Sequence, residues 1–176
     1  MSLFIFNLLD LKNVIRMIKP LTSLRFFFAL MIFAFHLDTI ILKTNSVFLK
    51  QFYSSVLEEG FIGVSFFFLL SGFILAYNYQ EPLLNKTKTK YSFFIARFAR
   101  IYPLHILCFL ISIPLSFTSF PPSLDSTWLI NALLNLTLTQ SFSLNPATIF
   151  SFNAPSWSIS NEMFFYFIFP FLIPLI

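Results

Sequence analysis

Charged side chains and glycine are both scarce in this chain of 176 residues: 10% of the residues are charged and only three are glycine. Soluble domains carry about 25% charged residues. Hydrophobic residues make up 57% of the chain and aromatic residues 20%, and the mean hydropathy is +0.82. A soluble fold of this size has too little interior for so much apolar surface, whereas a bilayer accepts apolar side chains on the outside of a protein. The sequence therefore predicts an integral membrane protein.

The chain also lacks the residues that build several common kinds of site. Cys108 is its single cysteine, so no intrachain disulfide forms and nothing points to an oxidising compartment. Metal-ligand clusters, glycine-rich phosphate loops and nucleophile elbows are absent from the sequence. The net charge of +4 comes from residues beside apolar runs rather than from a separate basic domain, which argues against nucleic acid as a partner. We expect no metal and no permanently bound cofactor.

Long apolar runs account for most of the sequence. A spanning helix needs about 20 predominantly apolar residues, and four runs approach that length: 24–42, 60–79, 101–117 and 157–176. A fifth run, 128–142, would form a helix only about 22 Å long, short of a bilayer core of about 30 Å, and is predicted to be a half-helix or an interfacial helix. The predicted fold is an all-α polytopic transmembrane helix bundle of about four to five spans, with residues 1–176 as a single transmembrane domain.

The basic residues predict the orientation of the bundle. Nine of the eleven precede or open the first run or lie between the second and third: Lys12, Arg16, Lys19, Arg25, Lys86, Lys88, Lys90, Arg97 and Arg100. Only Lys43 and Lys50 lie between the first and second runs, beside Glu58 and Glu59. Lys and Arg are concentrated in cytoplasmic loops. The N-terminus and the loop 80–100 are therefore predicted to be cytoplasmic, in a multi-pass protein of the cytoplasmic (inner) membrane.

The first apolar run contains three polar residues, Arg25, His36 and Asp38, and polar residues inside spans are functional candidates by default. Arg25 and His36 are eleven residues apart, which on a helix is within about 20° of three full turns and about 16 Å along the axis. They would share a face without touching, which suits two substrates arriving from two sides. The alternative is an anchoring arginine and a satisfied buried imidazole, and spacing alone does not choose. Asp38 faces away from His36 and is expected to mark the end of the span.

Two further patterns have both a functional and a structural interpretation. Ser71 and Gly72 in the middle of the second run would let another helix approach closely. Arg97 and Arg100 are three residues apart, so they share a helix face and could hold phosphate groups with two guanidinium forks. The alternative for the arginines is a topology signal alone.

The last apolar run begins with a helix-start pattern. Pro155 and Ser156 are typical of a helix N-terminus, and Ser156 is predicted to cap it. Glu162 is the only acidic residue of this run, and a carboxylate inside a membrane needs a partner or a raised pKa.

Four of these strings occur in a specific order: LTSLR at 21–25 followed by His36, GVSFFFLLSGF at 63–73, RFARIYP at 97–103 and PSWSISNEMFFY at 155–166. In this combination the chain strongly resembles acyltransferase family 3, the membrane-bound O-acyltransferases that modify bacterial cell-envelope sugars. The resemblance covers about residues 20–176 and corresponds to the N-terminal half of such enzymes.

The resemblance implies transfer of an acyl group, usually acetyl, from acyl-CoA as donor substrate to a carbohydrate hydroxyl of cell-envelope polysaccharide. His36 is then the expected general base, because imidazole titrates near neutral pH. The residues expected to act in catalysis are His36, Arg25 and Glu162; those expected to bind acyl-CoA are Arg97 and Arg100; and those expected to line the pocket or pack beside it are Ser71, Gly72, Trp157 and Ser158.

Two other functional classes are left open by the residues themselves. Intramembrane His, Arg and Glu also serve as proton-relay residues, so half of a non-catalytic transporter is one alternative. An inactive truncated fragment is another, because the chain stops inside an apolar run at residues 174–176. We expect that a C-terminal half acts as partner to this chain and that residues 1–176 alone do not transfer acyl groups.

Overall fold

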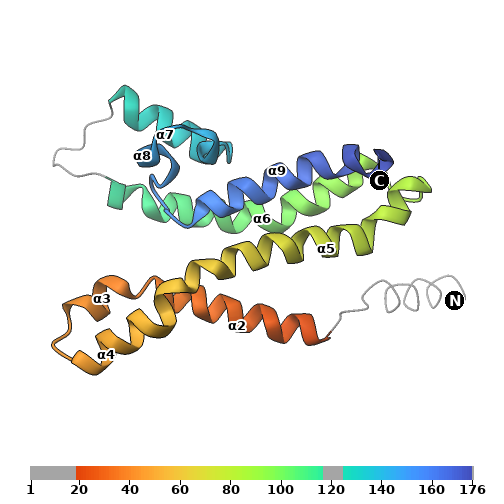
Figure 1. Cartoon of the computed structure of the whole chain (residues 1–176). Coiled ribbons are helices and arrows are strands. Elements are labelled where there is room, and N and C mark those ends of the chain that lie inside the picture. The colour runs from red at the N-terminus through yellow and green to blue at the C-terminus, as the bar shows by residue number, and fades with distance from the viewer. Residues whose placement is uncertain (1–18, 117–124, 176) are drawn as a thin grey trace, which may run out of the picture. The chain divides into compact units, whose positions relative to one another are not determined.

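A computed structural model describes residues 19–116 and 125–175, and within these ranges the chain forms helices and turns but no strand (Figure 1). The predicted all-α fold is confirmed. The chain divides into two compact units, Met1–Asn78 and Tyr79–Ile176. The basic residues Lys12 and Arg16, on which part of the orientation depends, lie outside the described residues.

The first unit is a helical hairpin in which one arm is broken by a turn and the other is continuous. One arm is α2 (Lys19–Phe35) followed by α3 (Asp38–Lys43). The other is one helical stretch in four parts: α4 (Val47–Phe52), the π-helix η1 (Tyr53–Leu57), the 3-10 helix η2 (Glu58–Phe61) and α5 (Ile62–Leu84), which continues into the second unit. Ser46 begins the second arm, because its hydroxyl accepts a hydrogen bond from the Leu49 backbone N–H at 3.3 Å.

Two glycines allow the arms of the first unit to cross closely. A Cβ atom on Gly60 would lie 2.7 Å from Cβ of Phe35 and 2.8 Å from the carbonyl oxygen of Met31. A Cβ on Gly63 would lie 2.9 Å from Cγ1 of Ile32. Any side chain at these two positions would therefore push α2 away, which is the small-residue packing typical of membrane helices.

The predicted close approach at Gly72 is not found inside this unit. Among the described residues of the first unit, no atom lies within 4 Å of a Cβ placed on Gly72. Helix crossing in this unit instead occurs about three turns earlier, at Gly60 and Gly63. Close packing at Ser71 and Gly72 stays a prediction for elements beyond this unit.

The second unit is an antiparallel helix pair with a group of short helices that carries buried polar side chains. Its elements after α5 are α6 (Lys90–Ser112), η3 (Pro114–Ser116), α7 (Ser126–Leu136), η4 (Gln140–Phe142), α8 (Pro146–Ile149), α9 (Ser156–Leu172) and η5 (Ile173–Leu175). Helices α6 and α9 run side by side in opposite directions (Figure 1). Phe93 near the start of α6 stacks on Phe169 near the end of α9, with ring centroids 5.7 Å apart.

Within residues 19–116 and 125–175, three helical stretches are long and apolar enough to cross a membrane: Val47–Leu84, Lys90–Ser112 and Ser156–Leu175. They correspond to the second, third and fourth apolar runs. The first run gives a shorter apolar helix, Ser23–Phe35, because α2 ends just before His36. The fifth run overlaps α7, whose 11 residues reach only about 16 Å, in agreement with a half-helix or interfacial helix.

The outer surface of both units is apolar. Phe26 on α2 is 72% exposed and Leu104 on α6 is 64% exposed, and many large hydrophobic side chains resemble them. Lipid accepts such a surface at no cost, whereas water does not. The chain is thus an all-α membrane protein.

Candidate functional site

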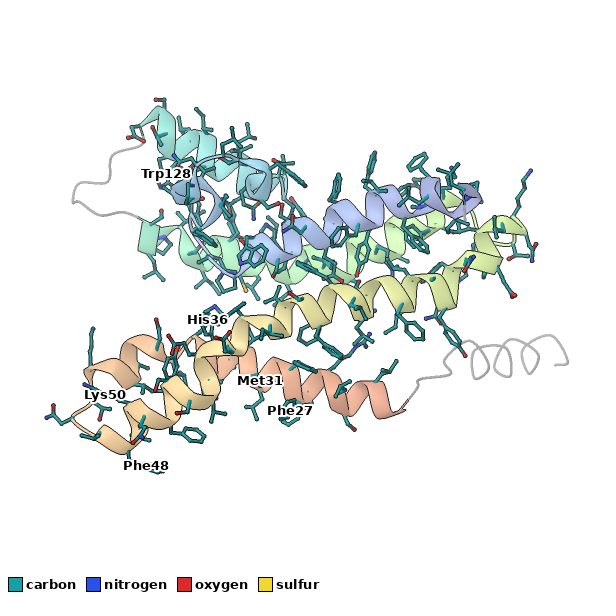
Figure 2. All side chains as sticks on the ribbon, in the orientation of Figure 1. Phe27, Met31, His36, Phe48, Lys50 and Trp128 are labelled. Carbon is teal, nitrogen blue, oxygen red and sulfur yellow. The ribbon has the colours of Figure 1, made fainter. Side chains whose placement is uncertain are left out.

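His36 lies in the turn that ends α2 (Figure 2). The last four carbonyl groups of a helix have no partner inside the helix, and here each has one. The backbone N–H of His36 donates to Ile32 at 3.2 Å and to Phe33 at 3.1 Å, and the N–H of Leu37 donates to Ala34 at 3.1 Å. The fourth carbonyl, on Phe35, accepts the phenol of Tyr53 at 2.8 Å. The last four carbonyl groups of α2 are therefore all hydrogen-bonded.

The ring of His36 is held in one tautomer. Its Nδ1 lies 2.7 Å from the carbonyl oxygen of Ile32. A carbonyl oxygen can only accept a hydrogen bond, so Nδ1 carries the proton and, in the neutral ring, Nε2 carries the lone pair. The side chain is exposed, and its ring meets the edge of Phe35 with centroids 5.3 Å apart. The arrangement presents Nε2 as a proton acceptor.

Arg25 lies on α2, half-buried, eleven residues before His36. Helix α2 is continuous from Lys19 to Phe35. The predicted distance of about 16 Å along the helix axis between Arg25 and His36 therefore applies to nearly all of the segment between them. Arg25 therefore lies near the middle of α2, about three turns before the turn that carries His36.

A second group of polar side chains lies in the other unit, where Arg97 is enclosed by two tyrosines. The guanidinium of Arg97 donates to the hydroxyl of Tyr79 at 2.9 Å. Its Cζ lies 5.0 Å from the ring centroid of Tyr79 and 5.7 Å from that of Tyr166. Tyr166 in turn donates its hydroxyl hydrogen bond to the carboxylate of Glu162. One buried tyrosine thus contacts both the arginine of α6 and the glutamate of α9, two of the residues singled out from the sequence.

The two arginines of the RFAR string have different surroundings. Arg97 is half-buried, and its Nε is buried without a hydrogen-bond partner among the described residues. Arg100 is exposed. Arg97 therefore has a packing role that its spacing from Arg100 did not reveal. Of the two side chains, Arg100 is the exposed one. A shared phosphate site for the pair stays a prediction.

A buried polar network lies beneath the start of α9. His105, 1% exposed, donates from Nε2 to the Asn135 carbonyl at 2.9 Å. Asn135 Oδ1 accepts the Ser156 hydroxyl at 3.5 Å, and the same hydroxyl accepts Gln140 Nε2 at 3.1 Å. Helix α9 begins at Ser156 as predicted, but the predicted cap is wrong: Pro155 occupies the cap position and the Ser156 hydroxyl points into the network instead. The network ties α6, α7 and α9 together.

The remaining predicted residues lie on α5 and on the first turn of α9. Ser71 is half-buried on α5, and Trp157 is half-buried beside the polar network. The hydroxyl of Ser158 donates to the carbonyl of Pro155 at 2.8 Å, a local bond within the first turn of α9. Their assignment to a substrate pocket stays a prediction.

Sequence reasoning missed Tyr79 and Tyr166 as partners of the candidate residues, and Tyr53 as the partner of Phe35 next to His36. Tyr166 could have been found, because it lies four residues after Glu162 and such pairs are neighbours on a helix. Tyr53 and Tyr79 are each 18 residues from their partners, a separation that carries no local pattern.

The fold and these side chains define a helical membrane protein with a presented histidine and a tyrosine-linked Arg–Glu pair. Residues 19–176 match the family described as Acyltransferase domain, and the chain belongs to that family. The resemblance inferred from the four ordered strings is confirmed.

Two curated proteins show what the chain is similar to. "Acyltransferase MdmB" of Streptomyces mycarofaciens is 38% identical over 163 residues, which cover 90% of this chain and 39% of that protein. "Protein 2 in picA locus" of Rhizobium radiobacter is 32% identical over 129 residues, which cover 65% of this chain and 66% of that protein. The chain thus spans about two fifths of the first relative and about two thirds of the second. No solved structure matches the chain.

Proposed function

We propose that this protein is a membrane-bound O-acyltransferase that moves an acyl group, usually acetyl, from acyl-CoA to a carbohydrate hydroxyl of cell-envelope polysaccharide. The observation that carries the proposal is the tautomer of His36. Its Nδ1–H is committed to Ile32 at 2.7 Å, so the exposed ring presents Nε2 as a base in a protein of the Acyltransferase domain family.

The reaction needs one base that later returns its proton. The acceptor hydroxyl oxygen attacks the thioester carbonyl carbon while its proton passes to Nε2 of His36, which forms an imidazolium. The C–S bond then breaks, and the CoA sulfur leaves with the proton from Nε2 as the new ester is released. The Ile32 carbonyl holds the ring in one orientation through both proton transfers, because it accepts the Nδ1–H at 2.7 Å.

The donor side is assigned to arginines. Arg100 is exposed near the middle of α6, and a guanidinium binds phosphate with two parallel hydrogen bonds. Arg25, eleven residues from His36, is proposed to act on the donor as well. Glu162 is proposed to orient His36 or to balance the charge of Arg25.

A transfer assay tests the proposal. Membranes that contain the chain together with the C-terminal half expected as its partner are incubated with acetyl-CoA labelled in the acetyl group and with envelope polysaccharide, and alkali-labile label in the carbohydrate is measured together with released CoA thiol. Both products should form in equal amounts, because one acetyl ester accompanies each free thiol. Thiol release without carbohydrate ester would mean hydrolysis, and the absence of both products would contradict acyl transfer.

A further inference from the structure

Phe35, the last residue of α2, is held by two elements of the opposite arm. Its carbonyl accepts the hydroxyl of Tyr53 at 2.8 Å. The Cβ of Phe35 also packs closely against Gly60. A Cβ on residue 60 would lie only 2.7 Å from it, so no side chain fits there. The residue that follows is His36, so these contacts fix the backbone from which the presented imidazole projects.

The hydrogen bond from Tyr53 has a specific structural consequence. Three of the four last carbonyls of α2 are bonded by N–H groups of the turn itself, while Phe35 depends on a side chain 18 residues away. Without the phenol, this part-buried carbonyl would have no hydrogen-bond partner from the turn, and the unpaired acceptor would favour a rearranged turn. Tyr53 is only 6% exposed, so its position is itself well defined by packing.

The π-helix places this tyrosine. Tyr53 is the first residue of η1, the five-residue π-helical segment that separates α4 from η2. Single π-helical turns inside helices recur at functional sites. Here the wider turn precedes the glycine crossing, so the same stretch of chain supplies both the hydroxyl donor and Gly60.

We propose that Tyr53 is a positioning residue for His36: through the Phe35 carbonyl it holds the turn that keeps Nδ1 on Ile32 and Nε2 presented. The inference rests on the proposed function for its catalytic consequence. Its structural part concerns the tautomer and orientation of His36 and stands independently of any reaction.

Tyr102 offers a matched control. Its hydroxyl donates to the carbonyl of Leu136 at 3.0 Å, and Leu136 is the last residue of α7 as Phe35 is the last residue of α2. Tyr53→Phe and Tyr102→Phe therefore remove the same kind of bond from the same kind of helix end. Only the first of these ends carries His36.

The experiment uses the full chain labelled with 15N-histidine in membranes, with His36→Asn used to assign the resonances. In the wild type, the spectrum should show a protonated Nδ1 and a bare Nε2 for neutral His36. Tyr53→Phe should move the His36 resonances towards a mixture of tautomers, and Tyr102→Phe should leave them in place. Unchanged His36 resonances in folded Tyr53→Phe would overturn the proposal.

Kinetics then test the catalytic consequence. Tyr53→Phe should lower kcat by roughly 10- to 100-fold, as expected for a displaced reacting group, while KM for acetyl-CoA changes less than about twofold. A rise in KM with kcat unchanged would overturn the positioning role. If the wild type transfers no acyl group, the proposed function fails, and the resonances of His36 still decide the structural part.

A second variant covers the case in which Tyr53→Phe does not accumulate. Incorporation of 4-aminophenylalanine at position 53 keeps the ring and a weaker N–H donor. The His36 resonances and kcat should then shift part of the way in the same direction. Values identical to those of the wild type would overturn the proposal.

Discussion

His36 and His105, the two histidines of the chain, are held in opposite tautomers. His36 donates from Nδ1 to the carbonyl of Ile32 at 2.7 Å, and His105 donates from Nε2 to the carbonyl of Asn135 at 2.9 Å. Nε2 of His36 belongs to an exposed ring, whereas the remaining nitrogen of His105 is buried without a partner among the described residues. The first ring is open to its surroundings, and the second joins helices.

The first prediction follows from these tautomers. In His36→Asn, the amide nitrogen can replace Nδ1 as donor to Ile32, but no base stands in place of Nε2. We expect normal membrane levels and a loss of turnover of roughly 10²–10⁴-fold, the usual contribution of general-base catalysis. Acyl transfer is measured in membranes at matched protein levels.

The matched control is His105→Gln, because the amide nitrogen of glutamine can replace Nε2 as donor to Asn135. We expect this variant to lose stability by about 1–3 kcal/mol, the range for a disturbed buried polar group, and to keep most of its turnover per folded molecule. Near-normal transfer by His36→Asn would mean that His36 packs or binds but does not take the proton.

The second prediction separates the two arginines of the RFAR string. Arg100→Lys keeps the charge and loses the planar fork, so KM for acyl-CoA should rise roughly tenfold, as for one charge-assisted hydrogen bond of about 1.5 kcal/mol. Arg97→Lys removes the bond to Tyr79 and the contact with Tyr166, so its main effect should be a lower stability of about 1–2 kcal/mol. Steady-state kinetics and unfolding in detergent measure the two effects. Normal donor use by Arg100→Lys would leave the topology signal as the role of that residue.

Sequence patterns predicted the helical class and three of the spans because hydrophobic runs of about 20 residues report directly on the bilayer. They did not predict that α2 ends at Phe35, since the apolar run continues to Leu42. The break depends on a phenol 18 residues away that satisfies the end of the helix. It is a tertiary contact, which no local window contains.

The candidate residues also divide into those that the sequence could reveal and those whose surroundings only the structure shows. His36 and Glu162 could be chosen from the sequence because ionisable residues inside apolar runs are rare. The difference between Arg97 and Arg100 could not, because it arises from Tyr79 at the end of α5, in contact with α6 across the connecting loop. Spacing along one helix gives the face of a residue but not the neighbour that covers it.

The third prediction concerns the glycine crossing. Gly60→Ala places a methyl group 2.8 Å from the Met31 carbonyl oxygen, a backbone atom that cannot move aside cheaply. We expect destabilisation of about 1–3 kcal/mol, as for overpacking of a core. Gly72→Ala is the control, because nothing in its own unit lies within 4 Å of the new methyl group, and a helical alanine gains up to about 1 kcal/mol over glycine. Unfolding in detergent compares them, and equal stability of the two variants would contradict the crossing at Gly60.

The last prediction is the orientation of the protein in the membrane. Asn45 lies in the turn between α3 and α4, and Asn85 follows the end of α5; both are exposed. Nine of the eleven basic residues lie before the first apolar run, at its start, in the loop that contains Asn85 or in the first half of α6. Position 85 should therefore be cytoplasmic and position 45 should be outside. In a Cys108→Ser background, a membrane-impermeant maleimide added to intact cells with a permeable outer envelope should label Asn45→Cys at once. Asn85→Cys should react only after the inner membrane is opened. Labelling of position 85 but not of position 45 in intact cells would reverse the orientation and would place Arg100 on the side where acyl-CoA is not made.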